Sequence, residues 1–532
     1  MRSIPATRRD HLAVVVAVTI ILVVLVTPIG RGPIWEPNNA RWVLLARDIL
    51  DHGHWLMPEI RGVPNVFKPQ LYTWSIALAS LPAGHVTEFT AALPSLFSAM
   101  AGVAGVFAIA WHLWNIRAGI VAGLILTTTL NYFVFAQQIL ADVMMTAFMV
   151  WALYFLLRAR RDGAWGPLLG FYTCVGGAML SKGPPGLAAL GAAAVATWLE
   201  SGRPALRRLR PAVGVLVLAV FALPWLLPYL AKARPAFVNE VLIGEYGLWY
   251  LGPNGIAFRI AHMPLVLLYF LPWTLFLPAA VVWWRRSGSD QGGRFVLGWT
   301  LTLWLLVGLS GFYRARYYLP VYPGLAILTG EFFARASRFG VGRELRLGTI
   351  AFVVLTLGIL VAMVFPPVGF PGEALVYVPD SLLERVLIAV IAAIGMVGAL
   401  LASRRETLIG LGGLIALVMA AILAIEGYRS PLRRARYYDV PALGAAATAH
   451  ASPHGTVFGY PKLSLEYDVY ILRRIVDLGP GELDRLLPES STDAIILTRR
   501  RWTAAEADMV AAGWHVVESR TVGGVDIVVV GR

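Results

Sequence analysis

The feature that most constrains this chain is a series of long apolar runs separated by short polar stretches. Each run has about 18 to 25 residues, the length that an α-helix needs to cross the hydrocarbon layer of a membrane. The sequence therefore predicts a multi-pass α-helical membrane protein with about thirteen transmembrane helices. The runs lie near residues 12–30, 89–111, 116–135, 140–157, 165–181, 184–200, 212–231, 262–284, 293–311, 317–334, 347–366, 384–402 and 407–425.

The composition agrees with a membrane protein and argues against a soluble protein, a disulfide-linked protein and an enzyme that uses ATP or NAD. Of the 532 residues, 58% are hydrophobic and 14% are charged, whereas about a quarter of a soluble chain is charged. The first run lacks a small-residue cleavage site, so we expect a retained helix rather than a signal peptide. The single cysteine, Cys174, excludes an internal disulfide. No Gly-rich phosphate loop follows a predicted strand, which argues against ATP or NAD chemistry, and we predict no cofactor.

The formal net charge of +14 has a topological explanation. With thirteen spans, the arginine clusters all fall on the N-terminal side of the membrane, which the positive-inside rule makes cytoplasmic. Since this placement accounts for the arginines, we predict no nucleic-acid partner. Arginine-rich, lysine-poor usage is typical of high-GC bacteria, so we place the protein in a bacterial cytoplasmic membrane. The clusters are Arg8-Arg9, Arg158/Arg160/Arg161, Arg203/Arg207/Arg208/Arg210, Arg285-Arg286, Arg335/Arg338/Arg343/Arg346 and Arg404-Arg405.

The stretch from Pro33 to Trp74 is too polar for lipid and, by this topology, lies on the outer side. It belongs to a first outer loop over residues 31–88, in which we expect the chemistry to take place. One face of a predicted interfacial helix is apolar. Asn38 and Asn39 precede this helix as candidate N-caps. The apolar face consists of Trp42, Leu45, Ala46, Ile49 and Leu50.

Two charged residues stand at the outer ends of apolar runs. Asp142 follows Gln137-Gln138 and is either a functional carboxylate or a helix cap at the interface. Lys182 lies in the turn Ser181-Lys182-Gly183-Pro184, where it either meets an anionic group or extends to lipid headgroups. The sequence alone does not decide between these alternatives.

Two further outer segments carry candidate ligand contacts. Arg314 and Arg316 suit a phosphate group, although lipid headgroups would attract them equally. Tyr250 and Tyr317 are candidate sugar contacts, while an aromatic belt at the interface would have the same composition. His262 is either an acid–base group or a histidine held by ordinary hydrogen bonds.

The last hundred residues have mixed polarity and predict a small α/β domain on the outer side. We divide the chain into a transmembrane domain, residues 1–426, and an extracytoplasmic domain, residues 427–532. A docking or acceptor-positioning role is the only function we assign to the second. Its expected strands are Thr456–Tyr460, Ala494–Thr498, His515–Thr521 and Val525–Val530, and its expected helices are Pro441–Ala451, Gly481–Leu487 and Thr503–Ala512.

Five stretches in this order resemble one family, the GT-C membrane glycosyltransferases of the aminoarabinose-transferase and protein-O-mannosyltransferase-like group (glycosyltransferase family 83). The resemblance covers most of the membrane part, and the order is more specific than any single motif. The stretches are residues 35–69 with Trp35-Glu36-Pro37-Asn38-Asn39-Ala40-Arg41 and Lys68-Pro69, Gln138–Ala147, Ser181–Pro184, His262–Trp273, and Arg316-Tyr317-Tyr318-Leu319-Pro320 with Pro323.

The resemblance implies a GT-C fold and transfer of a sugar from a polyprenyl-phosphate carrier to an envelope acceptor on the periplasmic side. It also implies that Arg41 and Lys68 hold the carrier phosphate, with Lys182 and Arg316 as further cations, and that Asp142 is a second acidic position. Phe67 stands where the group often has a metal-binding Glu, so we predict no metal.

One departure from the pattern concerns the catalytic carboxylate. The group has Asp followed by Glu where this chain has Asn38 and Asn39, and an amide cannot take a proton from an alcohol. Glu36 takes the role of general base in one reading. In a second reading the acceptor is already anionic and needs no base.

The third reading is a non-catalytic protein that binds the carrier lipid or assists assembly. A transporter is disfavoured because the polar positions gather at the outer edge and the chain has no paired halves. The sequence does not reveal the sugar or the acceptor. It predicts that cations from separate outer turns converge on a lipid-borne phosphate at the edge of the bilayer.

Overall fold

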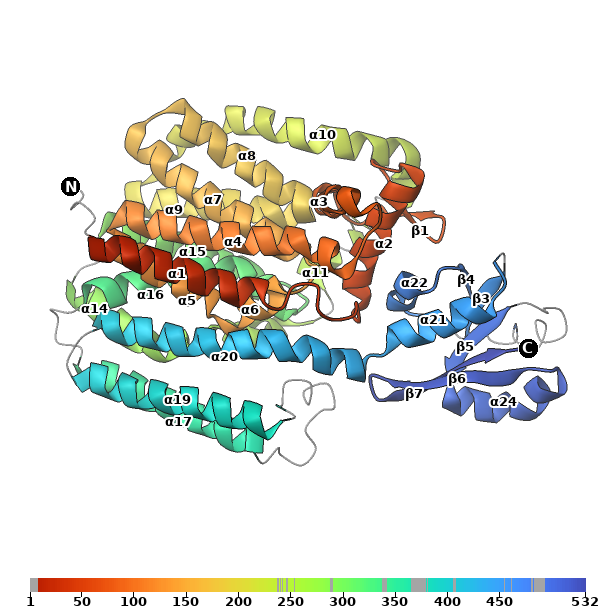
Figure 1. Cartoon of the computed structure of the whole chain (residues 1–532). Helices are drawn as coiled ribbons and strands as arrows, with labels where there is room; N and C mark the ends of the chain where they lie inside the picture. The colour runs from red at the N-terminus through yellow and green to blue at the C-terminus, as the bar shows by residue number, and fades with distance from the viewer. Residues whose placement is uncertain are drawn as a thin grey trace.

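The structure is a computed structural model in which a long helical bundle carries a small sheet domain at one end (Figure 1). The chain is described except for residues 1–7, 237–238, 240, 242, 245–246, 253, 288–289, 337–341, 365–378, 380, 405–407, 454, 461, 480–481 and 483–492.

Each predicted apolar run overlaps a helix or a bent pair of helices. Within the described residues, six helices are long and apolar enough to span a membrane, or eight if each bent pair is one span. The multi-pass fold is thus confirmed, while the number thirteen stays a prediction because the other runs lie on shorter or less apolar helices. The bundle helices are α1 Arg8–Val26, α3 Leu71–Ser80, α4 Glu88–Leu113, α5 Ile116–Thr127, α6 Leu130–Ala136, α7 Ala141–Asp162, α8 Trp165–Lys182, α9 Ala188–Ser201, α10 Pro211–Ala236, α11 Leu248–Leu251, α12 Ile256–His262, α13 Leu265–Tyr269, α14 Leu277–Ser287, α15 Gln291–Gly308, α16 Tyr322–Arg335, α17 Gly342–Val364, α19 Leu382–Arg404 and α20 Leu408–Tyr437.

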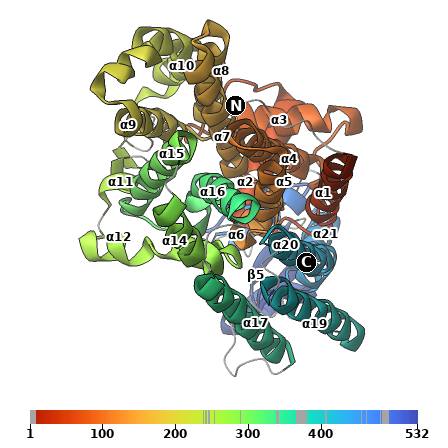
Figure 2. The same ribbon diagram turned by 90° about the vertical axis from the view of Figure 1, so that its left-hand side faces the viewer.

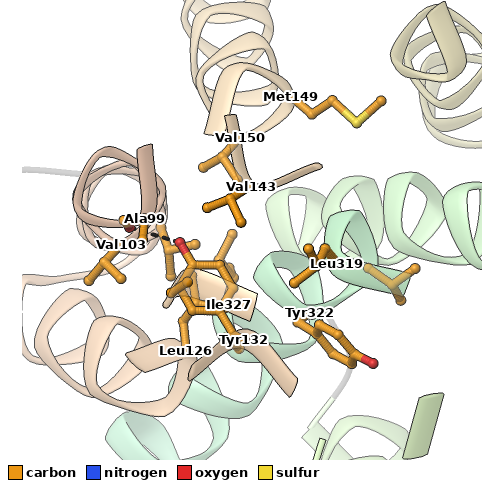
Figure 3. Packing of buried hydrophobic residues seen from close by; sticks show 14 of the residues in the cluster. Ala99, Val103, Leu126, Tyr132, Val143, Met149, Val150, Leu319, Tyr322 and Ile327 are labelled. Carbon is orange, nitrogen blue, oxygen red and sulfur yellow. Dashed lines mark hydrogen bonds between the residues drawn. The ribbon is translucent and has the colours of Figure 1, made fainter. Parts of the chain in front are cut away.

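The most buried part of the bundle is built from helices that approach closely over small residues. Figure 2 views the bundle end-on and places α16 near its centre, with α17 and α19 at the periphery. In the core, Tyr132 of α6 is fully enclosed and donates a hydrogen bond of 2.8 Å to the carbonyl of Ala99 (Figure 3). A Cβ on Gly102 would lie 2.6 Å from the Tyr132 hydroxyl, so a larger residue would require the Tyr132 side chain to shift.

The predicted interfacial helix is present as α2, Pro37–His52, and lies across the end of the bundle (Figure 1). Its predicted apolar face is buried except for Leu50, which is half-buried. The expectation that Asn38 and Asn39 cap this helix is wrong. Glu36 is the N-cap, and Pro37 begins the helix because proline's fixed φ suits the first helical position. Asn38 and Asn39 therefore belong to its first turn.

Two short strands follow α2 and lead back to the bundle. β1, Glu59–Ile60, and β2, Val63–Pro64, form an antiparallel hairpin whose two-residue turn is Arg61-Gly62. Lys68 lies between this hairpin and α3. The hairpin was not among the predicted elements, because two-residue strands leave no alternation to detect.

The C-terminal domain is a five-stranded mixed sheet of order β4-β3-β5-β7-β6. β3 pairs in parallel with β4 and β5, whereas β7 is antiparallel to β5 and β6. The four predicted strands are confirmed. β4 and α22 were not predicted, and the expected helix at 481–487 lies outside the described residues. The elements are α21 Val440–His450, β3 Thr456–Tyr460, α22 Leu465–Tyr470, β4 Arg474–Asp477, β5 Ala494–Thr498, α24 Arg499–Ala511, β6 His515–Val522 and β7 Val525–Gly531.

The sheet has a separate apolar cluster with each of its two long helices. Leu443 and Ala447 of α21 belong to one cluster, and Trp502 and Met509 of α24 belong to the other. The helix α20 continues to Tyr437, past the expected domain boundary at 426/427. The division of the chain at that residue stays a prediction.

Candidate active site

Charged side chains from five separate segments meet at the end of the bundle that faces the C-terminal domain. Glu36 caps α2, Lys68 follows the β-hairpin, and Asp142 lies in the first turn of α7. Lys182 ends α8, and Arg316 belongs to the 3-10 helix η6, Ala315–Val321. The bundle helices thus present their polar ends to the first loop at a single place.

Lys182 and Asp142 form a buried ion pair. Nζ of Lys182 donates to Oδ1 of Asp142, and the two side chains are 10% and 4% exposed. Lys182 also lies 4.6 Å from the centre of the Tyr317 ring, a cation–π distance. Two alternatives from the sequence are therefore wrong. Lys182 does not extend to headgroups, because it is buried, and Asp142 does not cap α7, whose N-cap is Leu140.

Glu36 keeps its carboxylate available to other groups, because it makes no capping hydrogen bond to α2. Its Oε1 lies 3.6 Å from an NH group of Arg316. Burial raises the pKa of Glu36, whereas the guanidinium groups of Arg316 and Arg314 lower it and the Asp142 carboxylate raises it. Glu36 and Asp142 are therefore neighbours in the same charged cluster.

Lys68 and Lys182 line one cavity of about 330 Å³. Lys182 also interacts electrostatically with Lys68 and Arg316, so three cations lie near one another in this cluster. The rest of the lining is mostly apolar and aromatic. It consists of Met145, Met149, Pro184, Pro185, Ala188, Tyr250, Leu303, Leu306, Val307, Tyr317 and Pro320.

This arrangement suits an amphipathic anion. A phosphate group suits the two lysines of the lining, since charge-assisted hydrogen bonds to phosphate are among the strong ones in proteins. An apolar chain suits the methionines and leucines, because burying apolar surface against them is favourable. Tyr250 and Tyr317, both predicted as ligand contacts, contribute the aromatic surface.

Six predicted residues lie outside the lining described for this cavity. Glu36, Asp142 and Arg316 belong to the charged cluster around Lys182, and the other three are Arg41, Asn38 and His262. Arg41 packs over Phe67, with its guanidinium carbon 5.8 Å from the ring centre, and so lies beside the residue that precedes Lys68. Asn38 is half-buried in the first turn of α2. His262 is buried and hydrogen-bonds to the Tyr318 hydroxyl through Nδ1 at 2.8 Å, within a cluster of aromatic rings. The roles predicted for these residues stay predictions.

The apolar wall of the cavity was missed at the sequence level. Met145 and Met149 stand one turn apart on α7, yet in a membrane protein such spacing equally describes a face toward lipid or a neighbouring helix. Leu303, Leu306 and Val307 on α15 are ambiguous for the same reason. Nothing in the sequence pairs α7 with α15 across a cavity.

Among the described residues, one group has donors arranged for a metal ion, and it lies at the far end of α2. The carboxylate of Asp48 is 2.8 Å from Nδ1 of His52 and 3.0 Å from Nδ1 of His54. The backbone N–H of Glu59 also donates to Asp48, at 2.8 Å. These three side chains belong to neither the cavity nor the charged cluster around Asp142.

Known structures share this architecture over almost the whole chain. The crystal structure of ArnT from Cupriavidus metallidurans bound to undecaprenyl phosphate superposes with a TM-score of 0.79 at 21% identity, covering 99% of this chain and 98% of that one. The apo form of the same protein superposes with a TM-score of 0.80 over 97% of each chain. The protein is therefore a multi-pass membrane protein with the GT-C fold of ArnT and a small C-terminal sheet domain.

Sequence comparison supports the same group. An undecaprenyl phosphate-alpha-4-amino-4-deoxy-L-arabinose arabinosyl transferase of Edwardsiella ictaluri is 27% identical over 365 residues, 66% of this chain and 65% of the relative. The corresponding enzyme of Yersinia enterocolitica is 25% identical over 390 residues, 70% of this chain and 68% of the relative. Residues 67–227 match the family described as dolichyl-phosphate-mannose-protein mannosyltransferase. The predicted resemblance to the aminoarabinose-transferase and protein-O-mannosyltransferase-like group is confirmed.

Proposed function

We propose that this protein is an inverting glycosyltransferase that moves a sugar from a polyprenyl-phosphate carrier to an envelope acceptor. The single observation that carries the proposal is a cavity lined by Lys68 and Lys182 and otherwise mostly by apolar and aromatic side chains. The relatives matched by sequence act on undecaprenyl-phosphate sugars, which have this combination of a phosphate and a long apolar chain. The reaction takes place on the periplasmic side of a bacterial inner membrane.

The cations stabilise the leaving group. When the bond between the anomeric carbon and the phosphate oxygen breaks, negative charge grows on the departing phosphate. Lys68, Lys182 and Arg316 lie where such charge would be bound, and contacts that strengthen as charge develops lower the barrier. Asp142 holds Lys182 in position through their buried ion pair.

Glu36 acts as the general base that accepts the proton of an acceptor hydroxyl. Its carboxylate lies in the charged cluster with Arg316 and is not used to cap α2. Arg316 lies 3.6 Å from Glu36 and also interacts with Lys182, so it is near enough to both groups to contact the base and the carrier phosphate. An acceptor that is already anionic would need only the cations and not Glu36.

Transfer is tested with the purified full-length protein in lipid nanodiscs. A polyprenyl-phosphate sugar is added with and without an extract of envelope glycolipids and glycans, and released carrier is measured by mass spectrometry. Carrier release that requires the extract, and a product heavier by one sugar, are expected. The same glycans compared by mass spectrometry in cells with and without the protein identify the sugar and the acceptor.

One observation favours a second candidate, a non-catalytic protein that binds the carrier. Asn38 stands where the resemblance places the family's catalytic Asp. The guanidinium of Arg316 also opposes the rise in the pKa of Glu36 that burial causes, which limits its strength as a base. In this case the carrier binds with the same dependence on Lys68, but no sugar is released with any extract. A Lys68→Ala variant that binds undecaprenyl phosphate as tightly as the wild type would contradict both candidates.

A further inference from the structure

One short helix of the C-terminal domain contacts the first loop at three separated points. This helix is α22, Leu465–Tyr470, and it lies against α2 although more than four hundred residues separate them in the sequence (Figure 1). Its last three residues supply a hydrogen bond or ion pair at each of these points. They reach the start of the loop, the middle of α2 and the β-hairpin.

The first contact holds the segment that leads into Glu36. The hydroxyl of Tyr470 accepts a hydrogen bond of 2.7 Å from the backbone N–H of Ile34 and donates one of 3.0 Å to the Glu88 carboxylate. Burial, together with the nearby Glu88 carboxylate, raises the pKa of Tyr470, so the hydroxyl keeps the proton that it donates. Ile34 is two residues before Glu36, and Glu88 begins α4. Tyr470 therefore links the start of the loop to the bundle.

The second contact is made by an arginine in the middle of α2. The guanidinium of Arg47 donates to the backbone carbonyl of Val469 at 3.0 Å and to that of Asp468 at 3.4 Å. These carbonyls lie in the last turn of α22, where intrahelical partners are missing. The arginine thus satisfies acceptors that the short helix leaves free and ties α2 to it.

The third contact holds the hairpin that precedes Lys68. Two nitrogens of Arg61 each lie 2.7 Å from an oxygen of Asp468, and a third lies 2.6 Å from Asp477. Asp468 is 9% exposed, so its carboxylate is largely shielded from water, while the Arg61 side chain stays 22% exposed. The position costs backbone energy, because Arg61 has a φ of +53°, which L-residues other than Asn, Asp and Gly seldom adopt. The ion pairs offset that strain.

We propose that α22 is a positioning element for the active site, and that Tyr470 and Asp468 are its positioning residues. The inference rests on the proposed function. Glu36 and Lys68 lie on a loop that leaves the bundle and returns to it, and α22 fixes this loop near both residues as well as in the middle. Without these contacts the loop still contains α2, but the distance between Glu36 and Lys68 is no longer fixed.

The sharpest variant is Tyr470→Phe, which removes the hydroxyl and keeps the ring in its packing. Tyr467→Phe is the matched control on the same helix, since no hydrogen bond of its hydroxyl is found among the described residues. We expect kcat to fall about 10- to 100-fold in Tyr470→Phe, because a misplacement of about 1 Å costs up to this factor. The Kd for undecaprenyl phosphate and the kinetics of the control should stay within about twofold of wild type.

A second pair of variants tests the hairpin contact. Asp468→Ala removes the partner of Arg61, whereas Asp468→Glu keeps a carboxylate and is expected to restore most of the lost kcat. Arg473→Ala is the control, because Arg473 lines the same surface between α2 and the domain but bonds to Ser452 and Leu472 of its own domain. Equal kcat in Asp468→Ala and Arg473→Ala would overturn the proposal.

Hydrogen exchange at the Ile34 amide gives a readout that needs no turnover. Faster exchange in Tyr470→Phe than in Tyr467→Phe, together with lower kcat, supports the positioning role. Faster exchange with unchanged kcat overturns it and leaves α22 as an anchor. If the wild type transfers no sugar, the proposed function has failed. In that case, the amide hydrogen-exchange rates of residues 33–36 are measured with undecaprenyl phosphate bound. Equal rates in Tyr470→Phe and Tyr467→Phe would overturn the inference that Tyr470 positions this loop.

Discussion

Replacing Lys182 with methionine tests the cavity most directly. The change removes the charge and keeps a side chain of similar length at a position that is 8% exposed. Lys182 lines the cavity beside Lys68 and is paired with Asp142. A charge-assisted hydrogen bond contributes about 1.5 to 3 kcal/mol. The Kd for undecaprenyl phosphate is therefore expected to rise roughly 10- to 150-fold.

The same change leaves Asp142 buried without its partner. Removing one member of a buried pair costs about 3 to 5 kcal/mol of stability, so weaker binding could follow from a damaged fold. The double variant Lys182→Met/Asp142→Asn separates the two effects, since it removes both charges at once. We expect it to unfold near the wild-type temperature while carrier binding stays weak.

The assay is titration of undecaprenyl phosphate into the protein in nanodiscs, followed by intrinsic tryptophan fluorescence, with thermal unfolding recorded on the same samples. Lys462→Met is the control, because this lysine is exposed in the C-terminal domain. If the double variant binds the carrier within twofold of wild type, Lys182 does not hold the phosphate, and the argument from the cavity is refuted.

Three further outcomes are expected. Glu36→Gln should lower kcat about 100- to 10,000-fold, the contribution of a general base, with carrier Kd unchanged; retained transfer would mean that the acceptor needs no base. Arg316→Gln removes a charge that lowers the pKa of Glu36, so that pKa rises. Because the base works only when ionised, the acidic limb of the kcat–pH profile should move to higher pH, and a shift to lower pH would contradict this. Gly186→Ala should lower the unfolding temperature and weaken carrier binding, because its Cβ would lie 2.4 Å from the backbone of α8 just before Lys182. Gly191→Ala, whose Cβ meets nothing nearer than 3.8 Å, should be close to neutral and serves as its control.

Local patterns in the sequence predict much of the fold and several residues of the candidate site. Apolar runs of membrane-spanning length predicted the multi-pass fold, and short apolar stretches in the last hundred residues predicted β3, β5, β6 and β7 with nearly correct ends. Asp142 was predicted to take part in the chemistry because a carboxylate at the edge of lipid is costly to keep, and Lys68, Lys182 and Arg316 because cations in outer turns suit a phosphate; these roles stay predictions. These signals reside in neighbouring residues, so no knowledge of the packing was needed to detect them.

Other features depend on groups that are distant in the chain. The sequence suggested Asn38 as a cap, yet Pro37 moves the start of α2 forward and gives that place to Glu36. The ion pair between Lys182 and Asp142 exists only because α7 and α8 pack against each other, and nothing in the sequence near either residue predicts its partner. Arg61 is likewise an unremarkable loop arginine until the fold brings Asp468 to it. Hydrophobic periodicity encodes which face of an element is buried, whereas the partner of a charge is set by packing that brings together segments far apart along the chain.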